Sequence, residues 1–213
     1  MKKTILKITI LILSVFFTCN VWSQRFEGGL RAGLVASEVS GDNLGGPNKL
    51  GWYASAYTFT PVAQNLSLKL EIMYITKGSR SVPTERNDFL EYAFHLQYVE
   101  VPVLVLVDVS QYSQSPVLEK LVLHAGLSGS VLVGYREQEF GADVPASEVE
   151  PFHPAELNIL LGFSYPLTER MNFHFGFSNS LTPIRPHSGR SKVWYNRGQY
   201  NTLWTFGVSY NFW

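Results

Sequence analysis

The chain has 213 residues, of which 16% are charged and 14% aromatic, and its 17 basic side chains balance its 17 acidic ones. A net charge of zero removes the electrostatic argument for a nucleic-acid partner, and we expect none. The charged fraction lies below the roughly 25% of a soluble domain, which indicates that much of the surface does not face water.

The first residues have the layout of a secretory signal peptide. Lys2 and Lys3 precede an apolar run over residues 8–17, and a Val-Trp-Ser stretch ending at Ser23 fits a cleavage site. The apolar core is about a dozen residues long, whereas a membrane-spanning helix needs roughly 20. We therefore expect residues 1–23 to be removed on export.

The remainder, residues 24–213, is expected to fold as one domain. It contains no second apolar stretch of spanning length, which argues against a helical membrane protein. Acylation of Cys19 after a lipoprotein-type signal is the alternative to cleavage after Ser23. Cleavage there leaves no cysteine in the mature chain, and therefore no disulfide or thiolate metal site.

Apolar and polar residues alternate along most of the mature chain. Such a period of two indicates strands, because a helix would scatter both sets around its circumference. The clearest segments are 66–74, 156–165, 171–178 and 200–212. Noisier but compatible segments are 25–37, 49–60, 92–109 and 120–136. A slip in the apolar phase near residues 94–97 predicts a β-bulge.

The connections between these segments alternate in length. The short or moderate ones are 61–65, 110–119 and 166–170. The long ones, rich in Gly, Pro and charge, are 38–48, 79–91, 137–154 and 183–198. This pattern predicts an all-β fold, an eight-stranded antiparallel up-and-down transmembrane β-barrel with short periplasmic turns and long extracellular loops.

The residue types on the two strand faces indicate which face points outward. The polar sets are dominated by Gly, Ser, Asn and Thr, a weak coat for a soluble lipid-binding barrel. Eight strands enclose a lumen that side chains can fill, and small polar residues suit it. We therefore expect the apolar face to contact lipid. Aromatic residues near strand ends fit membrane girdles: Tyr74, Tyr135, Tyr165, Tyr200, Tyr210 and Phe212.

Several ionisable side chains fall on the predicted inner face. They are Arg31, Lys69, Glu71, Glu100, His124, Glu156 and His174. Charges in a narrow, partly dry lumen must pair with one another or cost several kcal/mol each. We predict an ion-pair network that plugs the barrel; a narrow ion path is the alternative.

Three short motifs resemble a known family. They are the FEGGLRAGL stretch at 26–34, the LKLEIMY stretch at 68–74 followed by Lys77 and Gly78, and YVEVP at 98–102. They are similar to the outer-membrane β-barrel domain of PorT-like proteins from Bacteroidetes. The resemblance implies an eight-stranded barrel in the outer membrane. For one branch it also implies a part in secretion or gliding machinery, for which this sequence offers no marker.

The last strand is similar to the assembly signal of barrel proteins. The pattern combines Thr205 and Gly207 with the aromatic residues Tyr210 and Phe212. Many bacterial barrels stop at the last aromatic residue, whereas Trp213 follows it here. The partner that this resemblance implies is the barrel-assembly machinery.

Some eight-stranded membrane barrels are enzymes that modify lipid A with His and Ser side chains. The candidates here are His95 with Ser79 or Ser81, and His187 with Ser188. Their spacing shows no base held against a hydroxyl and oriented by a third group. We therefore predict a non-enzymatic protein with no catalytic residue, no cofactor and no metal site.

Two functions remain open. The first is an envelope scaffold or surface-interaction component in contact with outer-membrane lipids. Its candidate contact residues are Arg185, Arg190, Lys192, Trp194, Tyr195 and Arg197, for which lipopolysaccharide binding is a hypothesis. The second is an accessory of a secretion, gliding or transport system, with secretion-system components as partners.

Overall fold

A computed structural model describes residues 26–112, 115–145, 147–186 and 198–212. Its strands are β1 (Glu27–Ser40), β2 (Lys49–Ala63), β3 (Leu66–Arg80), β4 (Tyr92–Asp108), β5 (Val122–Glu139), β6 (Ala142–Asp143), β7 (Ala155–Pro166), β8 (Met171–Ser180) and β9 (Tyr200–Asn211). Within this part of the chain, the helices are short 3-10 segments, η1 (Glu85–Asn87), η2 (Ser110–Tyr112) and η3 (Leu118–Lys120). None of them is long and apolar enough to span a membrane.

The long strands close into a barrel. All pairs are antiparallel, in the order β4-β3-β2-β1-β9-β8-β7-β5, and β4 also pairs with β5 to complete the ring. The predicted fold class, an eight-stranded antiparallel barrel, is confirmed. The additional strand β6 pairs only with the tip of β5, inside the predicted long connection 137–154.

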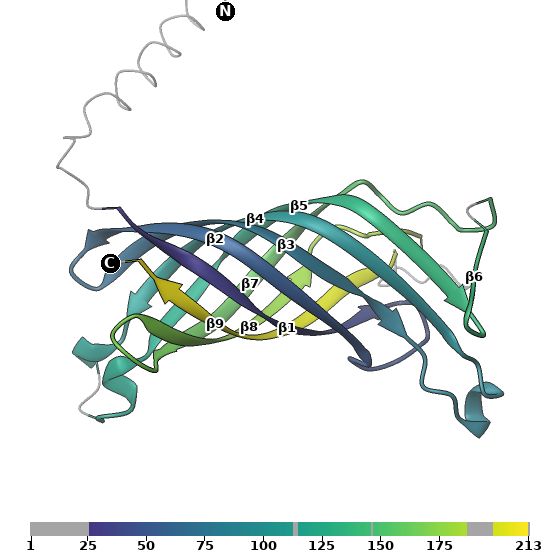
Figure 1. Cartoon of the computed structure of the whole chain (residues 1–213), viewed down its shortest axis with the longest axis horizontal. Helices are drawn as coiled ribbons and strands as arrows, with labels where there is room; N and C mark the ends of the chain where they lie inside the picture. The colour runs from purple at the N-terminus through teal and green to yellow at the C-terminus, as the bar shows by residue number, and fades with distance from the viewer. Residues whose placement is uncertain (1–25, 113–114, 146, 187–197, 213) are drawn as a thin grey trace, which may run out of the picture.

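The two ends of the barrel differ (Figure 1). The start of β1, the end of β9, and the short β2–β3 and β7–β8 turns lie at one end, which we call the turn end. The long connections and β6 lie at the other, the loop end. Strands run further into the predicted loops than expected: β1 reaches Ser40, β3 reaches Arg80 and β5 reaches Glu139.

The outer wall is apolar, as the choice of faces predicted. On β4 the outward residues from Val99 to Val105 are valines, each 38–47% exposed, while Glu100 between them is buried. From Val99 to Val107 the strand rises about 20 Å along the barrel axis, close to the roughly 25 Å apolar band of membrane barrels.

A bulge lies next to the predicted position, but its extra residue is on β5 and not on β4, where the apolar phase slips because Phe94 and Leu96 point into the lumen. The register of the two strands shifts between Gln97 and Tyr98, so that Gln97 pairs with Gly134 whereas Tyr98 pairs with Leu132. Residue 133, on β5, is the extra one and changes the inward parity of that strand, whereas β4 keeps its alternation, with Phe94, Leu96 and Tyr98 all buried. Beyond it Phe94 lies inside the barrel opposite Glu137.

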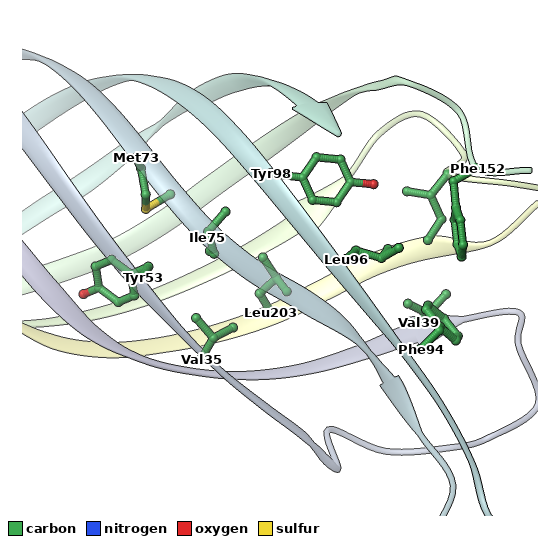
Figure 2. Close-up of a cluster of buried hydrophobic side chains, with 11 residues drawn as sticks. Val35, Val39, Tyr53, Met73, Ile75, Phe94, Leu96, Tyr98, Phe152 and Leu203 are labelled. Carbon is green, nitrogen blue, oxygen red and sulfur yellow. The ribbon is translucent and has the colours of Figure 1, made fainter. Parts of the chain in front are cut away.

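The interior differs from the expected filling of small polar residues. From the middle of the barrel to the loop end it holds an apolar cluster (Figure 2). Its members are Val35, Val39, Tyr53, Met73, Ile75, Phe94, Leu96, Tyr98, Phe152, Ile184 and Leu203. A wholly polar interior was therefore a wrong expectation.

Glycines make room for the largest of these side chains. A Cβ on Gly207 would lie 2.1 Å from the Tyr53 hydroxyl, and one on Gly33 would lie 2.8 Å from its ring. Gly33 and Gly207 are paired across β1 and β9. The Tyr53 ring thus occupies the space that two adjacent glycines leave in the lumen.

Candidate functional site

The central cluster of the interior is built around Lys77 on β3. Its ammonium lies 2.9 Å from the Glu100 carboxylate and also pairs with Glu156. All three side chains are at most 1% exposed. The Asn201 amide donates a 2.7 Å hydrogen bond to the other Glu156 oxygen. The contacts join β3, β4, β7 and β9, so the cluster crosses the lumen.

Hydroxyl and amide groups extend this cluster along β5 and β7. Ser128 donates to Glu100 over 2.6 Å, and Asn158 donates to Ser128 and Ser130 over 3.2 and 2.9 Å. Each carboxylate therefore has polar partners besides Lys77, which lowers the cost of keeping it away from water.

A second cluster lies toward the turn end. The Glu71 carboxylate is 3.0 Å from the Lys69 ammonium and 3.5 Å from the Arg31 guanidinium. Arg31 also donates to the Tyr53 hydroxyl over 3.0 Å, and the Lys69 ammonium lies 4.1 Å from the centre of the Tyr57 ring. Two cations thus share one carboxylate.

Two histidines lie beside this second cluster. His124 hydrogen-bonds Ser164 over 3.0 Å and His174 hydrogen-bonds Ser209 over 2.7 Å, with the imidazole rings 5.7 Å apart. Together with Lys69 they line a turn-end cavity of about 230 Å³. Nδ1 of His174 has no hydrogen-bond partner among the described residues, so nothing there orients this ring as a base.

The loop end is closed by Arg185. The guanidinium lies 4.7 Å from the centre of the Phe94 ring and 4.5 Å from that of Phe152. It pairs with Glu137 and donates a 2.7 Å hydrogen bond to Gln199. Arg185 is only 6% exposed, so its predicted place on a contact surface was wrong. The reason is that the backbone of Arg185 pairs with that of Gln199, which turns the Arg185 side chain into the barrel.

Asp42 follows β1 near this closure. Its carboxylate accepts a 2.9 Å hydrogen bond from the Leu44 backbone N–H. Burial raises the pKa of Asp42, and the Ser79 hydroxyl and the positive charge of Arg185 oppose this effect. The closure therefore contains a carboxyl group that is easier to protonate than a free one.

Comparisons with known proteins identify the family of the barrel. The family model of the outer membrane protein beta-barrel domain matches residues 21–185. The chain belongs to this family. The barrel is therefore an outer-membrane protein. No curated protein matches its sequence.

Solved outer-membrane barrels resemble it in fold. Neisserial surface protein A is 14% identical with a TM-score of 0.51, over 86% of this chain and 96% of that one. Ail of Yersinia pestis, solved with the heparin analogue sucrose octasulfate, is 11% identical with a TM-score of 0.48, over 88% and 99%. OprG of Pseudomonas aeruginosa is 12% identical with a TM-score of 0.40, over 89% and 97%. At such identities the likeness to neisserial surface protein A concerns the fold alone.

The structure places the predicted interior residues of the outer-membrane barrel in two groups. Arg31, Lys69 and Glu71 form the second cluster, next to the two histidines, while Glu100 and Glu156 belong to the central cluster.

Sequence reasoning placed neither Lys77 nor Glu137 in the network. Lys77 is an even number of residues from Lys69 and Glu71 on β3, so the alternation of that strand could have placed it on the inner face. Glu137 was hidden by the bulge, which changes the inward parity of β5.

The other predicted residues are dispersed. His95 lies on the outward face of β4, whereas Ser79 and Ser81 are buried, so the structure does not bring this candidate pair together. Thr205 points inward, while Tyr210 and Phe212 are 45% and 43% exposed on the outer side. Residues that lie outside the described chain are the signal segment 1–23, His187, Ser188, Arg190, Lys192, Trp194, Tyr195 and Arg197.

Proposed function

We propose that this outer-membrane barrel is a non-enzymatic envelope component, a scaffold or surface contact whose interior is plugged. The observation that supports it most is the central cluster, in which Lys77 links Glu100 and Glu156 across the lumen without exposure to solvent. Export by removal of residues 1–23 is part of the proposal.

Ion flow needs a continuous column of water, and two features oppose one. Lys77 and its carboxylates occupy the middle of the lumen. Arg185, held between Phe94 and Phe152, fills the loop end. The cavity beside His174 belongs to the turn end and reaches neither feature.

The arrangement of hydroxyls and histidines supports a non-enzymatic role. Of the candidate pairs, His95 and Ser79 lie on opposite sides of the wall. The pair of His174 and Ser209 has a hydrogen bond but no group that orients the imidazole, among the described residues. Nucleophilic catalysis needs that third group.

The partners that we propose are outer-membrane lipids, including lipopolysaccharide, and the barrel-assembly machinery, which would read the last strand. A role as a PorT-like accessory of secretion or gliding is the second candidate. It is favoured by the motifs at 26–34, 68–74 and 98–102, which fall in β1, β3 and β4. Recovery of secretion-system proteins after cross-linking in intact outer membranes would support it.

Conductance distinguishes a plugged barrel from a pore. The mature chain is inserted into planar lipid bilayers, and protease protection of the strands verifies insertion. We expect no stable single-channel current over ±100 mV, because the buried ion pairs block the lumen. A steady ohmic current at this voltage would contradict the proposal.

A further inference from the structure

A groove on the outside of the barrel has a composition that the membrane-facing wall does not share. It lies near the loop end, measures about 350 Å³, and draws on four neighbouring strands, β2 to β5. Its lining includes Lys49, Leu50, Arg80, Ala93, His95 and Gln138. We call it the outer-wall groove.

The strand register shows that the groove faces outward. Arg80 pairs with Ala93, and His95 pairs with Arg136 on β5. On β4 these positions continue the outward series of Val99, because Gln97, His95 and Ala93 alternate with buried residues. The groove therefore begins where the apolar band of the wall ends.

Its height matches the headgroups of the outer leaflet. An aromatic pair, Trp52 and Tyr74 with ring centres 5.2 Å apart, lies on the same wall nearer the turn end, one outward position from Leu50 on β2 and three from Arg80 on β3. Aromatic girdles mark the boundary between the hydrocarbon and the polar region of a membrane barrel. Residues just beyond such a girdle meet phosphates and sugars instead of acyl chains.

The charges of the groove favour an anion. Lys49, Arg80 and Arg136 all act electrostatically on His95. The opposing acidic groups are Glu91, which lines the groove, and Asp143, whose carboxylate is 2.6 Å from Arg136. Three cations against two carboxylates leave an excess of positive charge.

Arg80 is the cation best placed to bind a ligand. It is exposed and forms no ion pair with any described residue. Lys49 is only 7% exposed, and its ammonium donates a 2.7 Å hydrogen bond to the Leu50 carbonyl, so it adds positive charge to the groove instead of an exposed donor. An arginine can bind a phosphate through two parallel hydrogen bonds.

Small residues lie in and beside the groove on β3 and β4. Gly78 pairs with His95 and has a φ of +134°, where a Cβ would lie 2.0 Å from the Phe94 carbonyl oxygen. Any side chain at this position would be strained. Glycine at this position therefore lets β3 and β4 approach each other beside the groove, and Ala93, which pairs with Arg80, presents only a methyl group to it.

We propose that the outer-wall groove binds the phosphorylated sugar headgroup of an outer-leaflet glycolipid, with Arg80 as the main phosphate ligand and Arg136 and His95 beside it. The buried Lys49 adds positive charge from beneath. This site specifies the lipid contact of the proposed function. It rests on the proposed orientation, in which the long loops lie outside the cell. It also moves that contact from the predicted 183–198 segment to the wall.

The test measures binding of purified lipid A to the mature barrel in nanodiscs, with chemically dephosphorylated lipid A as the second ligand. We expect Arg80→Glu to weaken lipid A binding at least tenfold and to leave the weaker binding of the dephosphorylated form unchanged. Arg86→Glu makes the same charge change in the exposed η1 segment, away from the groove, and should stay within twofold of the natural chain.

Three results would overturn the site. They are equal losses in the two variants, equal affinity for both lipids, or displacement of lipid A by millimolar inorganic phosphate, which would indicate a simple anion site. Circular dichroism verifies that each variant is folded. If the natural chain conducts no current and Arg80→Glu binds lipid A as well as the natural chain does, only the groove is rejected and the plugged-barrel proposal stands.

Discussion

The ammonium of Lys77 lies 2.9 Å from the Glu100 carboxylate, on the neighbouring strand, and both side chains are sealed inside the barrel. The same ammonium also pairs with Glu156, from β7. One cation therefore faces two carboxylates, and its removal would leave both without a counter-charge. Lys77 is therefore a position of the interior where loss of one charge affects two partners.

Replacement of this lysine tests the arrangement. We expect Lys77→Met to lower the free energy of unfolding by about 3–5 kcal/mol, the usual effect of breaking a buried pair from one side. The measurement is urea unfolding in lipid vesicles, followed by circular dichroism. Lys120→Met, at an exposed site in η3, serves as the control and should change little.

Neutralisation of the partners should restore stability. The triple variant Lys77→Met, Glu100→Gln, Glu156→Gln removes all three charges, so that no buried ion remains in the central cluster. We expect it to regain most of what the single variant loses. A triple variant as unstable as the single one would show that packing around Lys77, rather than charge, is what matters.

The Arg185 closure gives the second prediction. Arg185→Ala removes the pair with Glu137 and the contacts with Phe94 and Phe152. Since a hydrogen bond to a charged group contributes about 1.5–3 kcal/mol, local opening of the loop end should become at least tenfold more frequent. Hydrogen exchange of the β4 and β5 backbone at the loop end measures it.

The matched control for this variant is Arg86→Ala, an exposed arginine at the same end of the barrel. It should leave the exchange rates as they are. If Arg185→Ala also left them unchanged, the closure would depend on the apolar cluster alone. The plugged interior would then rest entirely on the central cluster.

Most of the barrel could be predicted because a half-buried strand leaves a period of two in the sequence. The eight segments and the outward apolar face followed from this pattern, whereas the bulge was expected on β4 and lies on β5. The extension of β3 to Arg80 was missed, because Lys77 and Gly78 broke the apolar run at a point where the strand leaves the lipid.

The interior network could be predicted only in part, since parity says which side a residue is on but not which partner it meets. Glu71 and Lys69 are two positions apart on one strand, so their pairing was within reach. Glu156 meets Lys77 only because the barrel closes. Arg185 lay in a segment without alternation, and nothing local indicated that it points inward.

The pH dependence of the loop end follows from Asp42. Burial raises its pKa in the folded chain above the ordinary 3.8. The folded state therefore binds the proton more tightly than the unfolded state. The stability that this proton contributes is present below pH 3.8 and is lost as the pH rises through the folded pKa.

Asp42→Asn removes this dependence and can keep the hydrogen bond from the Leu44 backbone N–H. We expect the variant and the natural chain to unfold at similar urea concentrations near pH 3.5. The variant should become the more stable of the two as the pH rises toward 7. If the natural chain instead became the more stable of the two as the pH rose, the ionised Asp42 carboxylate would be stabilising, by its attraction to Arg185.

Glycine at position 33 is predicted to be essential for the register of β1. A Cβ there would lie 2.2 Å from the backbone carbonyl oxygen of Phe206 on β9, and backbone in a closed sheet cannot move aside. We expect Gly33→Ala to lower the folded fraction after refolding into vesicles by more than half. Gly129→Ala, where a Cβ would meet nothing within 4 Å, should refold like the natural chain.

The lipid-facing wall gives a prediction that depends on depth. Val103 and Gln97 both point outward from β4, Val103 in the apolar band and Gln97 beyond its loop-side end. An arginine at the bilayer midplane costs about 2–4 kcal/mol, and near the interface about 0–1 kcal/mol. Val103→Arg should therefore destabilise the barrel in vesicles by about 1–4 kcal/mol more than Gln97→Arg does. Because both variants add the same side chain to the same strand face, equal losses would contradict the placement of the valine series in hydrocarbon.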